Sequence, residues 1–508
     1  MTSNLYSELA AGFPDDGAPF IGGNADASCD YGQLHARSAQ WAHALCALGV
    51  QPGDRVAAQI DKSIDGLLLY LATLRVGAAF LPLNTAYTPT EMAYFVGDAA
   101  PALLVCAPEK AVALQGRIDT AIRTLGSDGI AGDLLPLVHA QSGSYTDVAR
   151  SAGDLAAILY TSGTTGRSKG AMLTHGNLLS NARVLREVWR YQRQDVLLHA
   201  LPIFHIHGLF VALNVSLAAG ASLALLPRFD ADAVFNALPS CNVMMGVPTF
   251  YVRLLQDARL TRESTRHMRL FVSGSAPLLA VTHREWQSRT GHAILERYGM
   301  TETSMNASNP LDGERIPGTV GLALPGVAIR ITDPTTGREL PTGDVGMIEV
   351  RGPNVFAGYW RNPEKTRAGF RDDGFFITGD LGILDERGYL RIVGRSKDLI
   401  ISGGYNVYPK EIESELDALP GVVESAVIGL PHGDFGEAVT AVVAIRPPDP
   451  AGASGPDEAA LLAVLRTRLA AYKCPKRILF VTDLPRNAMG KVQKNHLRDT
   501  YAALYSGN

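Results

Sequence analysis

A run of glycines, hydroxyl side chains and one lysine, from Thr161 to Gly170 (Thr-Ser-Gly-Thr-Thr-Gly-Arg-Ser-Lys-Gly), constrains the fold of this chain most strongly. Glycines let a backbone approach a phosphate closely and adopt positive φ, while hydroxyls and a lysine supply hydrogen bonds and charge. The mostly apolar residues Asp154–Tyr160 are typical of a short buried strand, and phosphate loops usually leave a strand end. The run therefore predicts a phosphate-binding loop, formed by Thr161, Ser162, Gly163, Thr164, Thr165, Gly166 and Lys169.

This loop differs from a Walker A loop. A Walker A loop places its lysine directly after the last glycine, whereas Arg167 and Ser168 follow Gly166 here. A generic turn rich in serine, threonine and glycine is the structural alternative for such a run taken alone.

Length and composition narrow the class of protein. The chain has 508 residues, 46% of them hydrophobic, which supports more than one domain with a large core. A formal net charge of -4 gives no support for a nucleic-acid partner. Five scattered cysteines without a C-x-x-C pair indicate neither a disulfide framework nor a zinc site. The N-terminus lacks a basic and apolar leader, and no run approaches about 18 apolar residues. These features predict a cytoplasmic protein without integral membrane association.

Strand-like apolar runs alternate with amphipathic helical patterns along the chain, as in α/β proteins. Tyr31–Gly49 has helical spacing with Gly49 as its C-cap, and Gly53–Ile60 is typical of a strand. A second helix is predicted over Ile64–Leu74 and a second strand over Ala78–Leu83.

A domain boundary is predicted at the glycine-containing, charged segment Gly394–Asp398, which leaves about 110 residues for a second domain. In that second part, Lys410–Asp417 has a helical pattern, and Glu424–Gly429 and Ala438–Ile445 have strand patterns. Pro447–Pro456 has the composition of a surface loop without a catalytic role.

Six motifs follow one another along the chain: Tyr160–Gly170, Gly274–Leu278, Glu296–Thr303, Ile377–Asp380, Gly394–Asp398 and Pro485–Lys491. In this order they resemble the adenylate-forming superfamily of acyl-CoA synthetases, luciferases and peptide-synthetase adenylation domains. The resemblance spans nearly the whole chain. It implies an α/β protein with a large N-terminal domain of layered sheets and helices (residues 1–394), a hinge (395–397) and a small mobile α+β C-terminal domain (398–508).

The chemistry of this superfamily explains why such residues are needed. Adenylation attacks the α-phosphorus of ATP with a carboxylate, so the site must neutralise the pyrophosphate that leaves. Glu302, inside a Thr-Glu-Thr cluster, is suited to hold Mg²⁺, which prefers one or two carboxylates with phosphate and water. An exposed glutamate in a turn is the alternative for Glu302. The resemblance places Thr165 and Glu302 among the catalytic residues.

The base of ATP needs a flat apolar surface. Tyr298 offers one, and the turn of Ser275, Ala276 and Pro277 offers backbone to line it. An ordinary core tyrosine is the alternative for Tyr298. The resemblance adds the neighbouring residues Glu296, Arg297, Gly299, Met300 and Thr301 to the ATP site.

The ribose needs a hydrogen-bond acceptor. Asp380 follows Phe375–Gly379 at a predicted strand end, where a carboxylate can accept both ribose hydroxyl protons, and it resembles the ribose-binding aspartate of the superfamily. An Asx-turn is the alternative for Asp380. Arg395, beside the predicted hinge, has a planar guanidinium that suits the ribose or the α-phosphate.

Lys491 is the residue expected to assist the first half-reaction. By resemblance, the small domain rotates and inserts this lysine between the carboxylate and the α-phosphate, where it stabilises developing charge. Lys397 occupies the hinge position, and a hinge absorbs the φ/ψ change between the two states. In the second half-reaction Gly403 and Gly404 offer thin backbone to line the pantetheine of CoA.

Within the superfamily the chain resembles malonyl-CoA synthetases. The segments that carry this resemblance are Leu201–Val211, Met245–Tyr251, Leu270–Leu279, His283–Trp286 and Glu296–Asn309. Malonate keeps a second, unreacted carboxylate, which demands a cation in the acyl pocket. Arg253, just after the segment that lines the acyl pocket in this superfamily, is the first candidate, with Arg284 and Arg297 next. An exposed helix residue is the alternative for Arg253.

One departure of this chain from the malonyl-CoA synthetases bears on its substrate. Malonyl-CoA synthetases have threonine between two histidines, whereas this chain has His205-Ile206-His207. His205 resembles the gating residue of the superfamily and is expected to be catalytic, while Ile206, His207 and Met305 are expected to line the acyl pocket. Because the larger Ile206 leaves less room near C2, malonate is expected to be preferred over methylmalonate.

Other functions remain open at this point. A carrier-loading adenylation domain is disfavoured because no carrier segment follows residue 508. A catalytically silent nucleotide-binding protein is disfavoured by intact Lys169, Asp380 and Lys491. A ligase for an aryl or another short-chain acid is the alternative within the same enzyme class.

Overall fold

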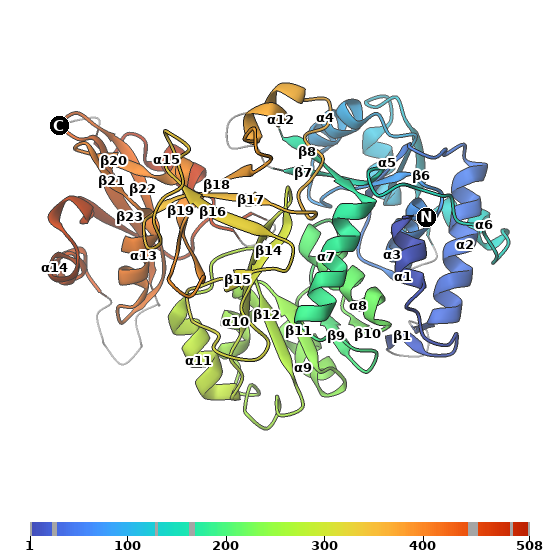
Figure 1. Cartoon of the computed structure of the whole chain (residues 1–508), viewed down its shortest axis with the longest axis horizontal. Coiled ribbons are helices and arrows are strands. Elements are labelled where there is room, and N and C mark those ends of the chain that lie inside the picture. Colours follow the sequence, from blue (N-terminus) through green and yellow to red (C-terminus); the bar gives the residue numbers. More distant parts are fainter. Residues whose placement is uncertain are drawn as a thin grey trace.

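The computed structural model describes residues 3–22, 28–127, 131–161, 168–445, 456–487 and 491–505. Among these residues the strands form four sheets, three in the large N-terminal part and one in the small C-terminal part. Figure 1 shows the C-terminal part, in orange and red, as a separate body at one end of the molecule. The arrangement confirms the predicted α/β class with one large and one small part.

Sheet A carries the predicted phosphate loop at its edge. Its neighbouring strands run parallel except for the last pair, in which β8 runs antiparallel to β7. In spatial order the strands are β6 (Ala121–Thr124), β5 (Leu103–Cys106), β3 (Arg55–Gln59), β4 (Ala79–Pro82), β7 (Leu155–Thr161) and β8 (Lys169–Thr174).

Sheet B has a parallel centre and antiparallel margins. In spatial order its strands are β15 (Leu322–Ala323), β14 (Ser304–Ser308), β13 (Leu295–Met300), β12 (Leu270–Ser273), β11 (Val243–Gly246), β9 (Val196–His199), β10 (Ser222–Leu225), β1 (Pro19–Gly22) and β2 (Cys29–Asp30). The carboxyl ends of its parallel strands meet at one edge, where ligands bind in open α/β sheets.

Helices cover and separate the two large sheets. Figure 1 shows α3, α7 and α8 between the strands of sheets A and B, and α3, α8 and the π-helix η2 are buried along nearly their whole lengths. The helical elements of this part are α1 (Leu5–Ala10), α2 (Tyr31–Ala47), α3 (Ile64–Arg75), α4 (Pro89–Ala99), α5 (Pro108–Leu114), α6 (Leu134–His139), α7 (His175–Val188), η2 (His207–Leu213), α8 (Asn214–Ala219), α9 (Ala231–Ala237), η3 (Leu238–Ser240), α10 (Pro248–Leu255), α11 (Ala280–Thr290) and α12 (Pro363–Gly369).

Local chemistry explains why the early helices begin and end where they do. The Asp30 side chain accepts a hydrogen bond from the Gln33 N–H in a capping box at the start of α2. Gly49 has φ of 89° just after the end of α2, in the left-handed region that favours glycine. The Ser63 hydroxyl accepts a hydrogen bond from the Gly66 N–H and so caps the start of α3. The helices and strands predicted for Tyr31–Leu83 are therefore confirmed to within a few residues.

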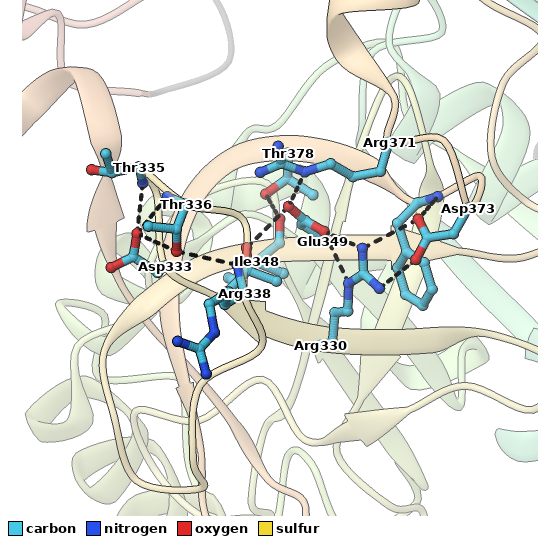
Figure 2. A network of polar contacts seen from close by, with 12 residues as sticks. Arg330, Asp333, Thr335, Thr336, Arg338, Ile348, Glu349, Arg371, Asp373 and Thr378 are labelled. Atoms are coloured by element: carbon cyan, nitrogen blue, oxygen red, sulfur yellow. Dashed lines mark hydrogen bonds and ion pairs between the residues drawn. The ribbon is translucent and has the colours of Figure 1, made fainter.

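Sheet C carries Asp380 and is held by a buried ionic network. Its antiparallel strands are β16 (Ala328–Thr332), β17 (Gly346–Arg351), β18 (Phe376–Leu384) and β19 (Leu390–Arg395). Figure 2 shows Glu349 on β17 between Arg330 and Arg371, at 2.8 and 2.7 Å. Glu349 is fully buried and also accepts a hydrogen bond from Thr332. This network ties β16 and the segment between α12 and β18 to β17, and so helps to hold the sheet that carries Asp380.

The C-terminal part is built on sheet D. Its strands are β21 (Tyr405–Val407), β20 (Ile400–Ser402), β23 (Gly436–Ile445) and β22 (Val422–His432), with β24 (Arg477–Val481) pairing with β23. The chain enters it from β19 through the short turn η4 (Ser396–Asp398). The helical elements that accompany the sheet are α13 (Pro409–Asp417), α14 (Glu458–Arg468), η5 (Ala471–Lys473) and α15 (Lys494–Tyr501).

The predicted loop Pro447–Pro456 lies outside the described residues except for Pro456. Within the described ranges, no helix is long and apolar enough to cross a bilayer. The five cysteines are free thiols, four of them buried.

Candidate active site

The predicted phosphate loop joins two paired strands. β7 ends at Thr161 and β8 begins at Lys169, and these two residues face each other across the antiparallel pair. Five of the predicted phosphate contacts, Ser162, Gly163, Thr164, Thr165 and Gly166, lie outside the described residues. The loop thus leaves a strand end, as predicted, but the chain returns as a second strand instead of a helix.

Glu302 is a buried carboxylate beside the loop. It is 7% exposed and accepts a hydrogen bond from the Tyr359 hydroxyl at 3.1 Å. The Lys169 ammonium lies 5.7 Å from the centre of the Tyr359 ring and is attracted to Glu302. Burial raises the pKa of Glu302, so a nearby cation would favour its ionised form. This setting excludes the exposed-turn alternative.

The environment of Glu302 suits a magnesium ion carried in with ATP. No group of three or more histidine, cysteine or acidic side chains is placed to hold a metal among the described residues. Mg²⁺ needs only one or two carboxylates when substrate phosphates and water complete its shell. Glu302 would supply that carboxylate.

Asp380 connects two sheets. Its carboxylate accepts a hydrogen bond from the Tyr298 hydroxyl at 2.7 Å and pairs with the Arg395 Nε at 3.0 Å. The Asp380 N–H donates to the Thr378 hydroxyl. The predicted strand end is wrong, because Asp380 lies in the middle of β18, where the register shifts by Leu381.

Lys491 reaches this site from the C-terminal part. Burial lowers the pKa of its ammonium to about 8, and repulsion from Arg395 and Arg297 acts in the same direction. Attraction to Asp380 and Glu302 opposes that shift. Lys491 is therefore close enough to both Asp380 and Glu302 for their charges to act on its ammonium.

The site has an excess of positive charge. The two carboxylates (Glu302 and Asp380) are outnumbered by five cations that interact with them or with one another (Lys169, Arg297, Lys365, Arg395 and Lys491). A triphosphate and a substrate carboxylate would supply the missing negative charge. The excess therefore favours an anionic ligand over a neutral one.

The other predicted nucleotide residues occupy the edge of sheet B. Ser275 begins the turn with Ala276 and Pro277, and it has φ of 71°. Gly299 leaves no space for a side chain, since a Cβ there would lie 1.9 Å from the Ser304 carbonyl oxygen. Met300 and Thr301 are half-buried at the end of β13. The carboxylate of Glu296 is buried and faces His283 Nδ1 at 3.5 Å.

Arg297 is a buried cation without a carboxylate partner among the described residues. It is 3% exposed, and burial lowers its pKa to about 9. Its Nε and Nη2 atoms have no hydrogen-bond partner within the described part of the chain. The guanidinium lies against Gly274, where a Cβ would come within 2.5 Å of its Cζ. The arrangement is ready to accept an anion from outside the protein.

Two neutral histidines accompany Arg297. Burial lowers the pKa of His205 to about 3 and that of His207 well below its usual value, with Arg297 adding repulsion to both. His207 Nδ1 lies 3.2 Å from the Ser275 hydroxyl, and its Nε2 lacks a partner within the described ranges. Neutral rings leave the positive charge on Arg297 and offer hydrogen bonds beside it.

The other two arginines predicted as candidates for the acyl pocket, Arg253 and Arg284, are not buried. Arg253 is exposed on α10, and its guanidinium lies 6.0 Å from the centre of the Phe229 ring. Arg284 is exposed on α11. Arg253 is thus a solvated cation in this structure whereas Arg297 is buried, and the choice of arginine for a second carboxylate stays a prediction.

Ile206 and Met305 are both buried in the large apolar cluster, at 3% and 1% exposure. Ile206 immediately precedes the π-helix that begins with His207. π-helical turns are frequent at functional sites. That Ile206 and Met305 contact a bound acid stays a prediction.

Gly403 and Gly404 form the tight turn between β20 and β21. Both have positive φ, 58° and 82°, and Ser402 pairs with Tyr405 across the turn. This is the two-residue hairpin geometry that glycine favours. Tyr405 is 60% exposed and stacks on Tyr472 at 4.7 Å. The turn is thus an exposed backbone edge beside an aromatic surface.

The sequence reading missed Tyr359 and Tyr251. Tyr359 bonds Glu302 from 57 residues away in the chain, and Tyr251 on α10 interacts with Arg297 while its hydroxyl donates to the Val272 carbonyl. Tyr251 ends the segment Met245–Tyr251 but had no role assigned to it, and Tyr359 lies in none of the motifs. The only sequence signal for Tyr359 was the pair of aromatic residues Tyr359-Trp360 directly after Gly358.

These features define an α/β fold in which charged residues from the large and the small part of the chain come together. The family description "AMP-binding enzyme" matches residues 7–360, and "AMP-binding enzyme C-terminal domain" matches residues 411–491. The chain belongs to the AMP-binding enzyme family.

Individual relatives narrow the comparison. A malonate–CoA ligase of Arabidopsis thaliana is 37% identical over 89% of this chain and 78% of its own. A feruloyl-CoA synthase of an Amycolatopsis species is 38% identical over 92% of this chain and 93% of its own. Crystal structures of MatB from Rhodopseudomonas palustris are 59% identical and cover 99% of this chain and 100% of theirs. The TM-score is 0.96 with ATP-bound MatB and 0.85 with apo MatB, so this structure resembles the ATP-bound form more closely.

The pKa of Lys491 predicts a pH limit for adenylation. The protonated ammonium is the form that stabilises negative charge, so kcat/KM for ATP should fall as pH rises through about 8. Lys491→Arg should move this fall above about pH 10, because the guanidinium keeps its proton. Pyrophosphate release measured from pH 6 to about 10 tests both proteins. An unchanged pH profile in the arginine variant would show that another group titrates.

Proposed function

We propose that this protein is an ATP-dependent malonate–CoA ligase. Malonate attacks the α-phosphorus of ATP to form malonyl-adenylate and pyrophosphate, and the CoA thiol then displaces AMP to form malonyl-CoA. The buried Arg297, with no carboxylate partner among the described residues, is the observation that carries the choice of acid. The similarity to a malonate–CoA ligase of Arabidopsis thaliana and to MatB supports it.

In the first half-reaction the charges of the site hold two anions together. Lys169 and the loop before it bind the outgoing phosphates, and Glu302 holds the magnesium ion that ATP brings. Asp380 accepts hydrogen bonds from the ribose, with Arg395 beside it. Lys491 donates to the carboxylate and the α-phosphate as charge develops in the transition state.

Arg297 accounts for recognition of the unreacted carboxylate. A monocarboxylic or aryl acid would leave this buried guanidinium without a partner, which is costly in a water-poor pocket. Malonate presents a second carboxylate to it, with His207 and Ser275 as neutral hydrogen-bond partners. This contrast favours malonate over the aryl acid that the feruloyl-CoA synthase name suggests.

The second half-reaction needs a different face of the C-terminal domain. The domain rotates about Lys397, withdraws Lys491 and presents the Gly403–Gly404 turn to the pantetheine arm of CoA. The exposed Tyr405–Tyr472 pair beside that turn offers an aromatic surface for the nucleotide end of CoA. Free cysteines throughout are in keeping with a reducing cytoplasm.

A panel of acids tests the proposed function directly. The protein is incubated with ATP, Mg²⁺ and CoA together with malonate, methylmalonate, propionate, benzoate or ferulate, and the thioesters are identified by mass spectrometry. We expect malonyl-CoA to form fastest. If a thioester of benzoate or ferulate formed faster, the assigned substrate would be an aryl acid instead of malonate. If the acyl group were transferred to a carrier protein and not to CoA, the protein would be a carrier-loading adenylation domain.

The proposed role of Arg297 predicts that its removal lowers activity with malonate much more than activity with a monocarboxylic acid. Arg297→Met should lower kcat/KM for malonate several hundredfold, because breaking a buried ion pair costs about 3–5 kcal/mol. Propionate, which lacks the second carboxylate, should lose much less. Since no described carboxylate depends on Arg297, the melting temperature should not fall.

Arg253→Met is the matched control for this prediction. It removes an exposed arginine of the same charge, so malonate turnover should stay within about threefold. A larger loss in Arg253→Met than in Arg297→Met would return the distal carboxylate to Arg253.

Ile206 predicts discrimination at C2 of the acid. We expect malonate to be preferred over methylmalonate by tens-fold, since one methyl group in a tight pocket is worth about 1–3 kcal/mol. Ile206→Thr should narrow this preference and Ile206→Gly should narrow it further. Values of kcat/KM for both acids in the three proteins provide the measurement. Equal use of both acids by the unmodified protein would show that Ile206 does not face C2.

A further inference from the structure

Lys491 lies at one end of the segment Arg486–Val492, here called the hairpin, whose two ends pair with each other and whose residues 488–490 lie outside the described residues. Arg486 and Val492 form an antiparallel bridge across it. The Asn487 N–H donates to the Lys491 carbonyl at 2.9 Å, and the Lys491 N–H donates to the Asn487 side-chain oxygen at 3.0 Å. The backbone of Lys491 therefore cannot move without the hairpin. What fixes the hairpin on its domain then decides where the ammonium arrives.

One ion pair immediately after the hairpin has an unusual setting. The Lys494 ammonium lies 2.6 Å from the Glu413 carboxylate, and their side chains are only 19% and 8% exposed. The same Glu413 oxygen accepts the N–H of Val427 at 2.9 Å. Glu413 on α13 thus holds Lys494 and strand β22 at one point. Although burial acts in the opposite direction, Lys494 and Lys410 lower the pKa of Glu413.

A second ion pair lies before the hairpin. Arg486 pairs with Glu424 on β22, but these side chains are 32% and 27% exposed. Solvent screens exposed pairs, which usually contribute little. The Glu413–Lys494 pair is the better shielded of the two and is the stronger candidate for fixing the hairpin.

The helix that follows is held at its other end as well. Lys494 begins α15, and Arg498 on the same helix pairs with Asp398 at 2.7 Å. Asp398 is the neighbour of Lys397, the predicted hinge residue. Leu497 packs α15 against the apolar face of β22. The base of the hairpin is therefore connected both to β22 and to the start of the C-terminal domain.

We propose that Glu413 and Lys494 are positioning residues for Lys491 in the adenylation step, an inference that rests on the proposed role of Lys491. The Lys491 side chain has four rotatable bonds and crosses to the other domain, so it depends on a fixed backbone to reach the α-phosphate. Misplacing a catalytic group by about 1 Å can cost roughly 100-fold in rate. Neither Glu413 nor Lys494 needs to touch a substrate for this effect.

The two half-reactions separate this role from general support of the fold. Lys494→Met and Glu413→Gln should each slow malonate-dependent pyrophosphate release by about 10- to 100-fold. Thioester formation from preformed malonyl-adenylate and CoA should stay within about twofold, because Lys491 has left the site by then. Lys494→Arg keeps the ion pair and should restore most of the adenylation rate.

Glu415→Gln is the matched control. Glu415 lies on the same helix and forms an exposed pair with Arg468, at 3.1 Å, away from the hairpin. It should leave both half-reactions within about twofold. If Glu413→Gln does not fold, Lys494→Met carries the test, since its partly exposed side chain lies at a helix start.

Two results would overturn the proposal. Equal losses in both half-reactions would assign the pair to the stability of the domain, and an unchanged adenylation rate would show that the hairpin holds without it. Failure of the malonate assignment gives a different result, because the unmodified protein would then release pyrophosphate with another acid of the panel. The variants are compared with that acid in the same two assays.

Discussion

The Asp380 carboxylate is the interaction on which the rest of the site depends. One of its oxygens accepts from Tyr298 on sheet B, and the other pairs with Arg395 at the end of sheet C. Lys491 is attracted to it from the C-terminal domain. Three parts of the chain therefore converge on one buried carboxylate, which lies in a sheet that the Glu349 network helps to hold (Figure 2). Loss of its position would separate the nucleotide contacts on both sheets.

The charges in this site suit an anionic ligand. Burial lowers the pKa of Lys491 and Arg297, so keeping these groups charged costs free energy that a bound anion would offset. The histidines beside Arg297 stay neutral, which avoids further repulsion. Substrate anions thus restore the electrostatic balance as they bind, and the binding energy is concentrated where charge develops.

Much of the fold and the nucleotide site could be predicted, because glycine turns, strand alternation and short motifs record local chemistry. The motifs that contain Glu302 and Lys491 lie far apart in the sequence, yet their resemblance to the superfamily predicted that both residues belong to one site. The sequence could not choose among the candidate arginines, since the exposure of Arg253 on α10 and the burial of Arg297 on β13 depend on tertiary packing. Tyr359 was missed for the same reason, because it lies 57 residues from Glu302 in the chain and contacts it only through the fold.

The close approach of Gly274 to Arg297 couples these two positions. A Cβ at position 274 would lie 2.5 Å from the guanidinium Cζ, so a larger residue there requires the arginine side chain to move. Because the guanidinium is buried, such a movement would also disturb the electrostatic surroundings of His205 and His207. The effects of substitutions at positions 274 and 297 should therefore not be additive.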